Sequence, residues 1–359
     1  MMHQPSPSSA IPIYLQLMDQ VKHGLVTGAL RPGEPLPDVQ SLAQELVISP
    51  NTVAKAYRHL EYEGVITVGD GTRALLPWKG HRTASGRLAT ASTSLAFENK
   101  WLTAQMLREV AARASSAREL AIAAEVQQTL LPQECPQMSG LDYAGASRPA
   151  LGVGGDYYDF IRFSENQLGI AIGDVSGKGI PAALLMATLR AYLRSQTDRA
   201  GDPAQIIATL NRLLYESSSA NRYATFFYAQ YDASTGVLTY TNAGHNPPFV
   251  LRRHGNLSSI VRLDPCGPVI GFLLECSYTA RSIVLEPGDL LLAFTDGISE
   301  AMNAGDEEWG EERLMELLCA NSTLTARALI DRVMTEADAF AEGALQHDDM
   351  TVVAVRRTE

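Results

Sequence analysis

The chain has 359 residues, of which 46% are apolar and 7% aromatic, and its formal net charge is −11. This length and composition suit two or three globular domains with buried cores, and they exclude disorder throughout the chain. The negative charge excludes a protein that coats nucleic acid or anionic membrane over its whole surface, but it leaves room for a small basic patch.

The start of the chain lacks the basic n-region and the apolar h-region of a signal peptide. No stretch approaches the run of about 18 uncharged apolar residues that spans a membrane. We therefore expect a cytoplasmic protein without a membrane segment. The four cysteines lie far apart without a C-x-x-C pair, so we expect buried, reduced thiols rather than a zinc site or a disulfide framework.

Residues 11–78 carry three helical patterns and then a strand-rich tail, and two of these patterns predict short helices joined by a tight turn. The first helix, in "LPDVQSLAQEL", begins after Pro37-Asp38, and the second, in "NTVAKAYRHLEYEG", has Asn51 as its expected N-cap and ends at Gly64. The residues expected on the buried faces are Val39, Leu42, Ala43 and Leu46 in the first helix, and Val53, Ala56, Tyr57 and Leu60 in the second. A helix-turn-helix followed by a wing around Gly69-Asp70-Gly71 is the expected result.

This segment, from "PIYLQLMDQVKHGL" to "NTVAKAYRHLEYEGVI", resembles the winged helix domain of GntR-type regulators over about the first 75 residues. The resemblance implies that the second helix enters the DNA major groove. The candidate DNA-facing residues are then Asn51, Thr52, Lys55 and Arg58, with Arg73 on the wing.

The charge of this segment leaves a second interpretation open. Residues 10–80 hold six Lys and Arg against seven Asp and Glu, whereas DNA-binding domains usually carry a basic footprint. Family members commonly have Arg at the positions of Gln40 and Ala54. The winged helix could therefore serve as a dimerisation or protein-binding module instead of a DNA reader.

Two connecting segments follow. Residues 79–96, "KGHRTASGRLATASTSLA", are small and polar and predict a flexible linker, whereas residues 97–131 predict a helix that ends before Pro132. A heptad-like seam runs through Leu107, Val110, Ala114, Ala117, Ala121, Ala124, Gln128 and Leu131. We expect a coiled-coil linker in a parallel homodimer, and the alternative is a single helix that lies on its own C-terminal domain.

The stretch "GDVSGKGIPAALLMA", residues 173–187, contains a Gly-Lys pair but does not fit a phosphate-binding P-loop. The first glycine of that motif would fall on Ile172, and Gly179 stands where the motif requires Ser or Thr. Asp174 instead ends a predicted strand, "LGIAIG", ahead of a helix expected to start at Pro181. Lys178 is expected to be a solvated loop cation.

Other aspartates also lie at predicted strand ends. Asp296 follows "DLLLAF", Asp348 and Asp349 precede "MTVVAV", and Asp156 follows two glycines in "VGGDYYDF". A single one of these would be interpreted as a turn residue that caps local amides. Several in one domain, without His or Cys spacing nearby, favour a site for hard cations such as Mg²⁺ or Mn²⁺.

Taken in order, the motifs from residue 125 to 357 resemble the PPM (2C) class of metal-dependent protein phosphatases, especially its SpoIIE and RsbU branch. They include "AAEVQQTLLPQECPQMSGLDYAGASRPALGVGGDYYDF", "GDVSGKGIPAALLMATLR" and "LEPGDLLLAFTDGISEAM". The resemblance implies an α+β, four-layer α-β-β-α sandwich over residues 132–357. It also implies two Mn²⁺ or Mg²⁺ ions, held by Asp156, Asp174, Asp296, Asp348 and the carbonyl of Val175, with Asp349 at a neighbouring position.

The implied activity is hydrolysis of phosphoserine or phosphothreonine by water activated between two divalent ions. The substrate expected from the branch is a phosphorylated regulatory protein, such as an anti-sigma-factor antagonist. We expect His245 to have a structural role in a turn, and His347 to support the neighbouring acidic pair. Two alternatives stay open: a GntR-like transcription regulator whose C-terminal domain senses a ligand or metal without turnover, and an interaction scaffold.

Overall fold

A computed structural model describes residues 4–5, 12–31, 33–62, 65–69, 73–75, 88–133, 135–197, 201–218, 222–254 and 257–358. The chain divides into two compact units, Met1–Ala114 and Ser115–Glu359, and each has its own apolar core. No helix among the described residues has the length and apolar character needed to cross a bilayer.

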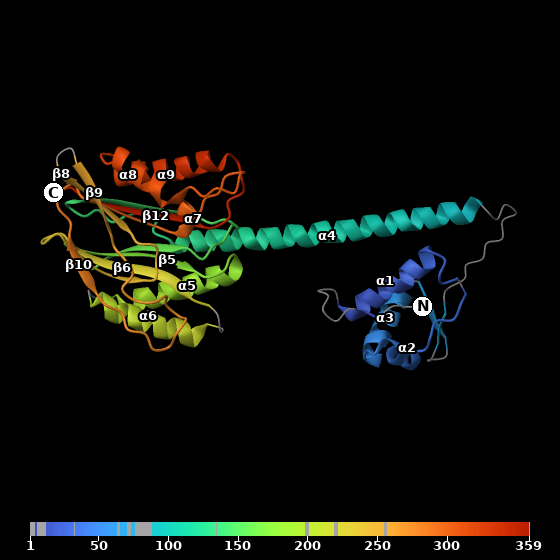
Figure 1. Ribbon diagram of the computed structural model, residues 1–359. Helices are drawn as coiled ribbons and strands as arrows, with labels where there is room; N and C mark the ends of the chain where they lie inside the picture. The colour runs from blue at the N-terminus through green and yellow to red at the C-terminus, as the bar shows by residue number, and fades with distance from the viewer. Residues whose placement is uncertain are drawn as a thin grey trace. The chain divides into compact units, whose positions relative to one another are not determined.

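Up to residue 75, the described part of the N-terminal unit has three helices and a short hairpin, coloured blue in Figure 1. Its elements are α1 (Ile13–Val26), α2 (Val39–Leu46), α3 (Pro50–Tyr62), β1 (Thr67–Gly69) and β2 (Arg73–Leu75), with the two strands antiparallel. The residues predicted to be buried in α3 are all buried, and so are three of the four in α2, where Val39 is partly exposed. The Asp38 carboxylate caps α2, since it accepts hydrogen bonds from the amides of Gln40 and Ser41 at 3.0 and 2.9 Å.

The predicted N-cap of α3 is wrong. The helix begins at Pro50, and the Ser49 hydroxyl accepts the Asn51 amide at 3.3 Å, so Asn51 lies in the first turn. Proline suits the first helical position because its fixed φ is helical and no amide hydrogen is lost there, and the preceding serine then becomes the cap. The wing tip at residues 70–72 and the side chain of Arg73 lie outside the described residues.

The predicted helix of residues 97–131 starts earlier than expected. Helix α4 spans Leu88–Leu130, so residues 88–96 of the predicted linker are helical, while residues 79–87 lie outside the described part. Residues 88–96 contain neither Gly nor Pro, so nothing in their sequence interrupts the helix. Small polar composition was therefore a poor indicator of a linker.

The C-terminal unit contains two five-stranded antiparallel sheets. Sheet I has the order β10-β7-β6-β5-β4, and sheet II has the order β3-β12-β11-β8-β9. The strands of sheet I are β10 (Arg281–Val284), β7 (Val237–Ala243), β6 (Ala224–Asp232), β5 (Gln167–Val175) and β4 (Tyr157–Arg162). The strands of sheet II are β3 (Leu141–Arg148), β12 (Met350–Arg357), β11 (Leu290–Phe294), β8 (Phe249–His254) and β9 (Leu257–Arg262).

Helices cover the outer faces of both sheets (Figure 1). Helices α5 (Ile180–Gln196) and α6 (Pro203–Ser217) pack on sheet I through residues such as Met186 and Leu210. Helices α8 (Gly310–Ala320) and α9 (Ala326–Ala341) pack on sheet II, and α7 (Asp296–Ser299) is a single turn. Between the sheets lies a third cluster with residues from both, including Ile170, Phe227 and Val353.

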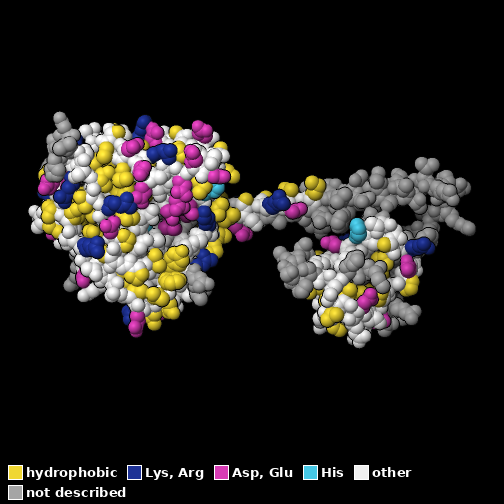
Figure 2. Space-filling view, in the orientation of Figure 1, with side chains coloured by type: hydrophobic (Ala, Val, Ile, Leu, Met, Phe, Trp, Pro, Cys, Tyr) yellow, Lys and Arg dark blue, Asp and Glu magenta, His cyan; other side chains and the backbone are white. Residues whose placement is uncertain are grey.

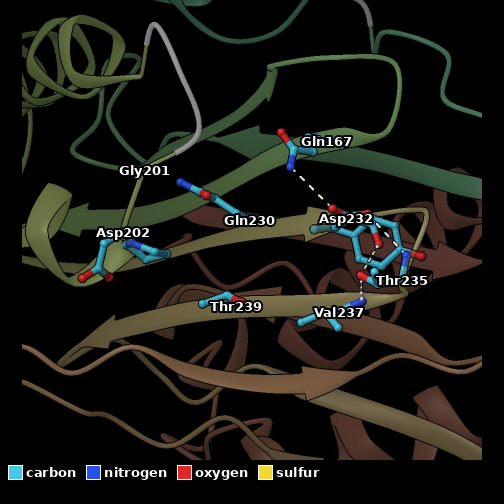
Figure 3. Close-up of a pocket in the computed structure, with 10 residues that line it drawn as sticks. Gln167, Gly201, Asp202, Gln230, Asp232, Thr235, Val237 and Thr239 are labelled. Carbon is cyan, nitrogen blue, oxygen red and sulfur yellow. Dashed lines mark hydrogen bonds between the residues drawn. The ribbon is translucent and has the colours of Figure 1, made fainter.

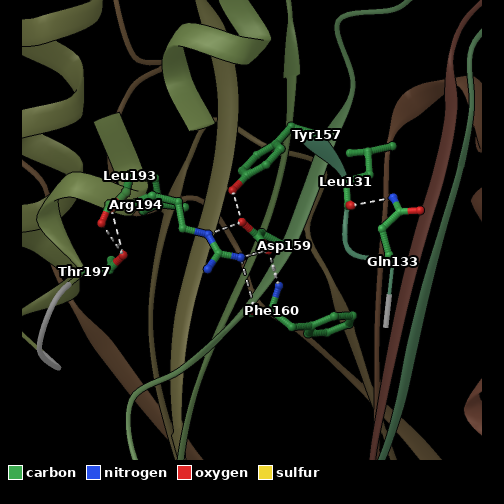
Figure 4. Close-up of polar contacts among 8 residues, drawn as sticks. All are labelled: Leu131, Gln133, Tyr157, Asp159, Phe160, Leu193, Arg194 and Thr197. Atoms are coloured by element: carbon green, nitrogen blue, oxygen red, sulfur yellow. Dashed lines mark hydrogen bonds and ion pairs between the residues drawn. The ribbon is translucent and has the colours of Figure 1, made fainter. Parts of the chain in front are cut away.

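A buried acidic side chain ties α5 to the edge strand of sheet I (Figure 4). Asp159 of β4 is 1% exposed, and it binds Arg194 of α5 through two hydrogen bonds of 2.7 and 2.5 Å. The Tyr157 hydroxyl and the Phe160 amide also donate to this carboxylate, at 2.6 and 2.9 Å. The buried charge is thus fully paired, as a stable interior requires.

The four cysteines are unpaired, in agreement with the sequence. Cys135, Cys266 and Cys276 are partly buried, but Cys319 is exposed, so the expectation of four buried thiols is wrong. Cys319 lies near the end of α8, one residue after Leu318, which takes the buried position of that turn.

Candidate metal site

The antiparallel registers bring the predicted aspartates together at two sheet edges. In sheet I, Asp156 immediately precedes β4 and Asp174 is the penultimate residue of β5, and these strands pair with Tyr157 opposite Gly173. In sheet II, Asp348 and Asp349 precede β12, while Asp296 follows β11, and these strands pair with Phe294 opposite Val352. Consecutive antiparallel strands place the end of one beside the start of the next, so each pairing gathers its carboxylates.

Direct contacts join the two edges. The Thr295 hydroxyl, at the end of β11, donates to Asp156 at 2.7 Å and accepts the Thr351 amide at 3.0 Å. The Asp349 carboxylate accepts the amides of Gly155 and Ala150 at 2.7 and 2.8 Å. These bonds hold the loop that carries Asp156 against sheet II.

Three glycines allow this close approach. A Cβ at Gly154 would lie 2.0 Å from an Asp349 carboxylate oxygen, and one at Gly155 would lie 2.6 Å from the Val175 carbonyl oxygen. A Cβ at Gly297 would lie 2.1 Å from the backbone oxygen of Asp349. The glycines before Asp156 and after Asp296 are therefore packing requirements of the site.

Burial and mutual repulsion raise the carboxyl pKa values here. The pKa of Asp174 rises to about 7, mainly through burial and then through the charges of Asp296, Asp348 and Asp349. The pKa of Asp156 lies well above its usual range because the group is buried and adjoins Asp174. Burial also raises the pKa of Asp296 and of Asp349. The fold holds these carboxylates close together although they repel one another. A bound cation would relieve the repulsion, so the site favours cation binding.

Glu300 belongs to the same acidic group and was not predicted. Burial and then the charge of Asp296 raise its pKa. It follows the single turn α7, which Asp296 opens, and its amide donates to the Asp296 carbonyl at 2.7 Å. The sequence signal was its spacing of four residues from Asp296 across a helical turn.

The donor set fits Mg²⁺ or Mn²⁺, because it consists of carboxylate and carbonyl oxygens. Among the described residues, however, no three acidic, His or Cys side chains are arranged to hold one metal ion. The carboxylate oxygens of Asp349 already accept two backbone amides, and one oxygen of Asp348 is paired with Lys178 at 2.8 Å. The structure thus gathers the predicted ligands without fixing which oxygens bind metal.

Lys178 is not the free loop cation that the sequence suggested. Its Nζ lies 2.8 Å from Asp348 Oδ2 and also donates to the backbone carbonyl of His347. The hydrogen bond to Asp348 raises the pKa of Lys178. The prediction failed because the sequence places these residues far apart, and only the fold brings them together.

The two histidines lie where a structural role is expected. His245 is 1% exposed, its Nδ1 lies 2.9 Å from the Thr225 hydroxyl, and its amide donates to Asn242 at 2.8 Å. Burial lowers the pKa of His245 to about 4, so the ring is neutral at physiological pH and is a poor general acid. His347 is exposed and contributes its carbonyl to Lys178.

Helix α4 contributes a further residue that the sequence did not single out. The Gln127 side chain donates to the Gly154 carbonyl at 2.7 Å and accepts the Gly154 amide at 3.0 Å. It thereby holds both backbone groups of a residue two positions before Asp156. The only signal in the sequence was a polar residue in the apolar stretch before "TLLP".

The predicted DNA-facing residues lie on one side of α3. Asn51, Lys55 and Arg58 are exposed and Thr52 is partly exposed. Lys55 and Arg58 line an open depression of about 530 Å³ together with His59 and Tyr62, and Tyr62 is 92% exposed. The Lys55 ammonium also lies 4.0 Å from the centre of the Tyr14 ring.

A second cavity, of about 470 Å³, lies away from the aspartates (Figure 3). Gln167, the first residue of β5, lines it, whereas Asp174 is near the other end of that strand, roughly 23 Å away at the usual rise per residue. Its carboxylates, Asp202 and Asp232, accept local hydrogen bonds, from Ala204 and from Ser234 and Gln167. This cavity therefore does not extend the acidic site.

Comparisons with known proteins bear on both units. The family described as "Stage II sporulation protein E (SpoIIE)" matches residues 164–358, and "Bacterial regulatory proteins, gntR family" matches residues 13–75. The phosphoserine phosphatase RsbU of Bacillus subtilis (strain 168) is 34% identical over 242 residues, which cover 67% of this chain and 70% of RsbU. Protein IcfG of Synechocystis sp. is 32% identical over 266 residues, but the chain spans only 41% of its length.

Other known proteins match the winged helix by sequence and the C-terminal unit by fold. The HTH-type transcriptional repressor YtrA of Bacillus subtilis is 45% identical over 73 residues, which cover 20% of this chain and 56% of YtrA. The SiaA-PP2C domain of Pseudomonas aeruginosa superposes with a TM-score of 0.61 at 19% identity, covering 68% of this chain and 98% of that domain. At this identity the match shows the fold alone, namely the two-sheet arrangement.

Proposed function

The chain belongs to the SpoIIE family of PPM-type protein phosphatases, and on this premise we propose that it removes phosphate from serine or threonine of a regulatory protein, under the control of its GntR-type winged helix. One observation carries the proposal: strand ends of both sheets bring five aspartates to one place, and the pKa values of Asp156, Asp174, Asp296 and Asp349 are raised there. The helix–sheet–sheet–helix packing would then be the four-layer sandwich expected of the class.

The strand-end aspartates would be the metal ligands. Asp156, Asp174, Asp296 and Asp348, with the Val175 carbonyl, would hold two divalent ions, Mn²⁺ or Mg²⁺. Such ions, when bound, acidify water and stabilise negative charge on phosphoryl oxygens.

The remaining groups of the site would position these ligands. Asp349 would hold the Asp156 loop through the Ala150 and Gly155 amides rather than bind metal. Thr295 would orient the Asp156 carboxylate through its 2.7 Å hydrogen bond. His245, neutral and buried, would support the strand end opposite Asp174 through Thr225, its hydrogen-bond partner.

Asp296→Asn tests the metal assignment. Loss of one ligand charge should reduce Mn²⁺-dependent hydrolysis of p-nitrophenyl phosphate by more than tenfold, while circular dichroism stays unchanged. Asp264→Asn, which alters an exposed carboxylate, is the matched control and should retain wild-type turnover. Turnover of Asp296→Asn within tenfold of wild type at low millimolar Mn²⁺ would contradict the assignment.

The relatives support a proposal for the substrate class. RsbU is described as a phosphoserine phosphatase, and we propose a phosphorylated anti-sigma-factor antagonist, or a similar regulatory protein, as the substrate here. Phosphoproteomics of a deletion strain would identify it. The substrate's phosphosite should rise in that strain and fall on complementation with wild type, but not with Asp174→Asn.

A regulator without turnover is the second candidate. It is favoured by the pairing of Asp348 with Lys178 and by the absence, among the residues described, of three side chains arranged around one ion. In that case the site would sense a ligand or cation. A lack of Mn²⁺- and Mg²⁺-dependent turnover by the purified chain would favour this candidate.

We further propose that α4 pairs in a parallel homodimer and that its conformation controls the acidic site. Within the C-terminal unit, every residue of α4 from 115 to 122 is exposed, so this stretch of the helix does not pack on the rest of its own unit. Gln127, one turn further on, touches Gly154. A change in helix register would therefore act on the loop that carries Asp156.

The winged helix would either localise the phosphatase domain or regulate its activity. The exposed face of α3 has two cations with His59 and Tyr62 beside them, a combination suited to contact with DNA phosphates and bases. We propose that Asn51, Thr52, Lys55 and Arg58 face DNA, with Arg73 on the wing. A protein-binding role for the same domain is the alternative.

A further inference from the structure

The loop between β5 and α5 is held firmly on both sides. The Ser176 amide donates to the Tyr223 carbonyl at 2.9 Å, and the Ser176 hydroxyl accepts the Tyr223 amide at 3.1 Å. Arg222 donates to the Ser176 carbonyl at 3.1 Å. Gly177 and Gly179 have φ values of 98° and 71°, which residues with a side chain rarely adopt, so the turn requires glycine at both positions. Lys178 stands between these glycines as the one long side chain of the turn.

The Lys178 ammonium faces the acidic group. Besides its contact with Asp348, it is close enough to Asp296 and Asp349 for their charges to act on it. The side chain of Lys178 is 44% exposed and that of Asp348 is 33% exposed, so water reaches the pair. Ion pairs with this exposure are weak and open readily. Figure 2 shows acidic side chains gathered beside Lys and Arg side chains on one face of the C-terminal unit.

Until cations occupy it, this site presents a strong negative potential to a phosphate monoester. Six carboxylates lie in the group, namely Asp156, Asp174, Asp296, Asp348, Asp349 and Glu300. A phosphoryl dianion needs cationic donors, and an ammonium forms short, charge-assisted hydrogen bonds with its oxygens. The neighbouring cation Arg222 donates to the Ser176 carbonyl, and among the described residues no ion pair joins it to the acidic group.

We propose that Lys178 binds the non-bridging oxygens of the substrate's phosphoryl group, leaving Asp348 when substrate arrives. The inference rests on the proposed phosphatase function and adds a substrate-binding residue to it. Asp348 and the phosphoryl group compete for the same ammonium. A carboxylate that ligates a cation attracts an ammonium less, so the exchange favours the phosphoryl group in the active protein.

The test compares Lys178→Gln and Lys178→Arg with wild type in the full chain. For Lys178→Gln, KM should rise about tenfold for both p-nitrophenyl phosphate and a phosphopeptide, and the inhibition constant of inorganic phosphate should rise by a similar factor. Lys178→Arg keeps the charge and should recover most of the loss. Arg253→Gln removes an exposed charge elsewhere and should change none of these values.

Two binding measurements separate this role from simple neutralisation of Asp348. Calorimetric titration with Mn²⁺ alone should show equal or tighter binding for Lys178→Gln. In this variant Mn²⁺ no longer competes with the Lys178 ammonium for the Asp348 carboxylate. A phosphonate analogue of the phosphopeptide should bind about tenfold more weakly to this variant.

Three results would overturn the inference: KM and phosphate inhibition within twofold of wild type, weaker Mn²⁺ binding alone, or a KM change confined to the phosphopeptide. If wild type shows no turnover, the proposed function fails first. The phosphonate titration then still decides the role of Lys178.

Discussion

Asp174→Asn should stabilise the protein when EDTA has removed its metal ions, although the same substitution should abolish activity. In the folded protein the pKa of Asp174 is raised to about 7, whereas an unperturbed aspartate has 3.8. Between these values the folded state binds more protons than the unfolded state, so stability falls as pH rises from about 4 to 7. At about 1.4 kcal/mol per pH unit, the fall for this group is on the order of 4 kcal/mol.

The raised pKa values of Asp156 and Asp296 act in the same direction. The free energy of unfolding of wild type in EDTA should therefore fall by at least this amount as pH rises. Asparagine removes the titrating group but keeps the shape. In EDTA the variant should therefore have a free energy of unfolding about 2–4 kcal/mol higher than that of wild type at pH 8, and the same free energy of unfolding at pH 4. Turnover with Mn²⁺ should be lost, since stability and function conflict where charges are crowded.

The measurement is urea unfolding in EDTA from pH 4 to pH 8, followed by pulse proteolysis so that the C-terminal unit is scored separately. Asp264→Asn, at an exposed site, should follow wild type at every pH. Wild-type stability that stays constant or rises between pH 5 and 7 would refute the reasoning. So would an Asp174→Asn protein that is less stable than wild type at pH 8.

Three further outcomes are expected. In urea unfolding, Arg194→Met should cost about 3 kcal/mol because it leaves a buried carboxylate without its cation, whereas Asp159→Asn should cost about 1–2 kcal/mol; equal costs would contradict this asymmetry. The double variant Ala117→Glu, Ala121→Glu should be monomeric by light scattering and altered in turnover, and unchanged mass with unchanged turnover would exclude the coupling. If the winged helix binds DNA, affinity in gel shifts should fall steeply with salt and with Arg58→Ala, and a flat salt response would exclude it.

The sequence was most informative where local pattern decides structure. The helix start at Pro37-Asp38, the buried face of α3 and the strand ends that carry Asp174 and Asp296 follow from periodicity and turn chemistry, and all are found. The two-domain organisation followed from motifs, and the family matches confirm it. In each case the evidence lies within a few residues of the feature.

The failures concern contacts between distant segments and a helix that composition alone could not exclude. Lys178 and Asp348 are 170 residues apart in sequence, and so no local pattern could pair them. Gln127 and Gly154 are 27 residues apart in sequence, so their contact could not be predicted from a local pattern either. Residues 88–96 looked like a linker because they are small and polar, yet alanine and serine tolerate a helix when no breaker is present.

The pairing of β3 with β12 has a consequence for how the C-terminal unit is made. Leu141 pairs with Arg357, so the first strand of this unit closes on the last, with β12 between β3 and β11. During synthesis β3 must wait for the C-terminal strand, which is a contact of very high sequence separation and hence of slow closure. Asp348 and Asp349 arrive with that strand. A nascent or clipped chain that lacks β12 would thus have an unpaired β3 and an acidic site without Asp348 and Asp349.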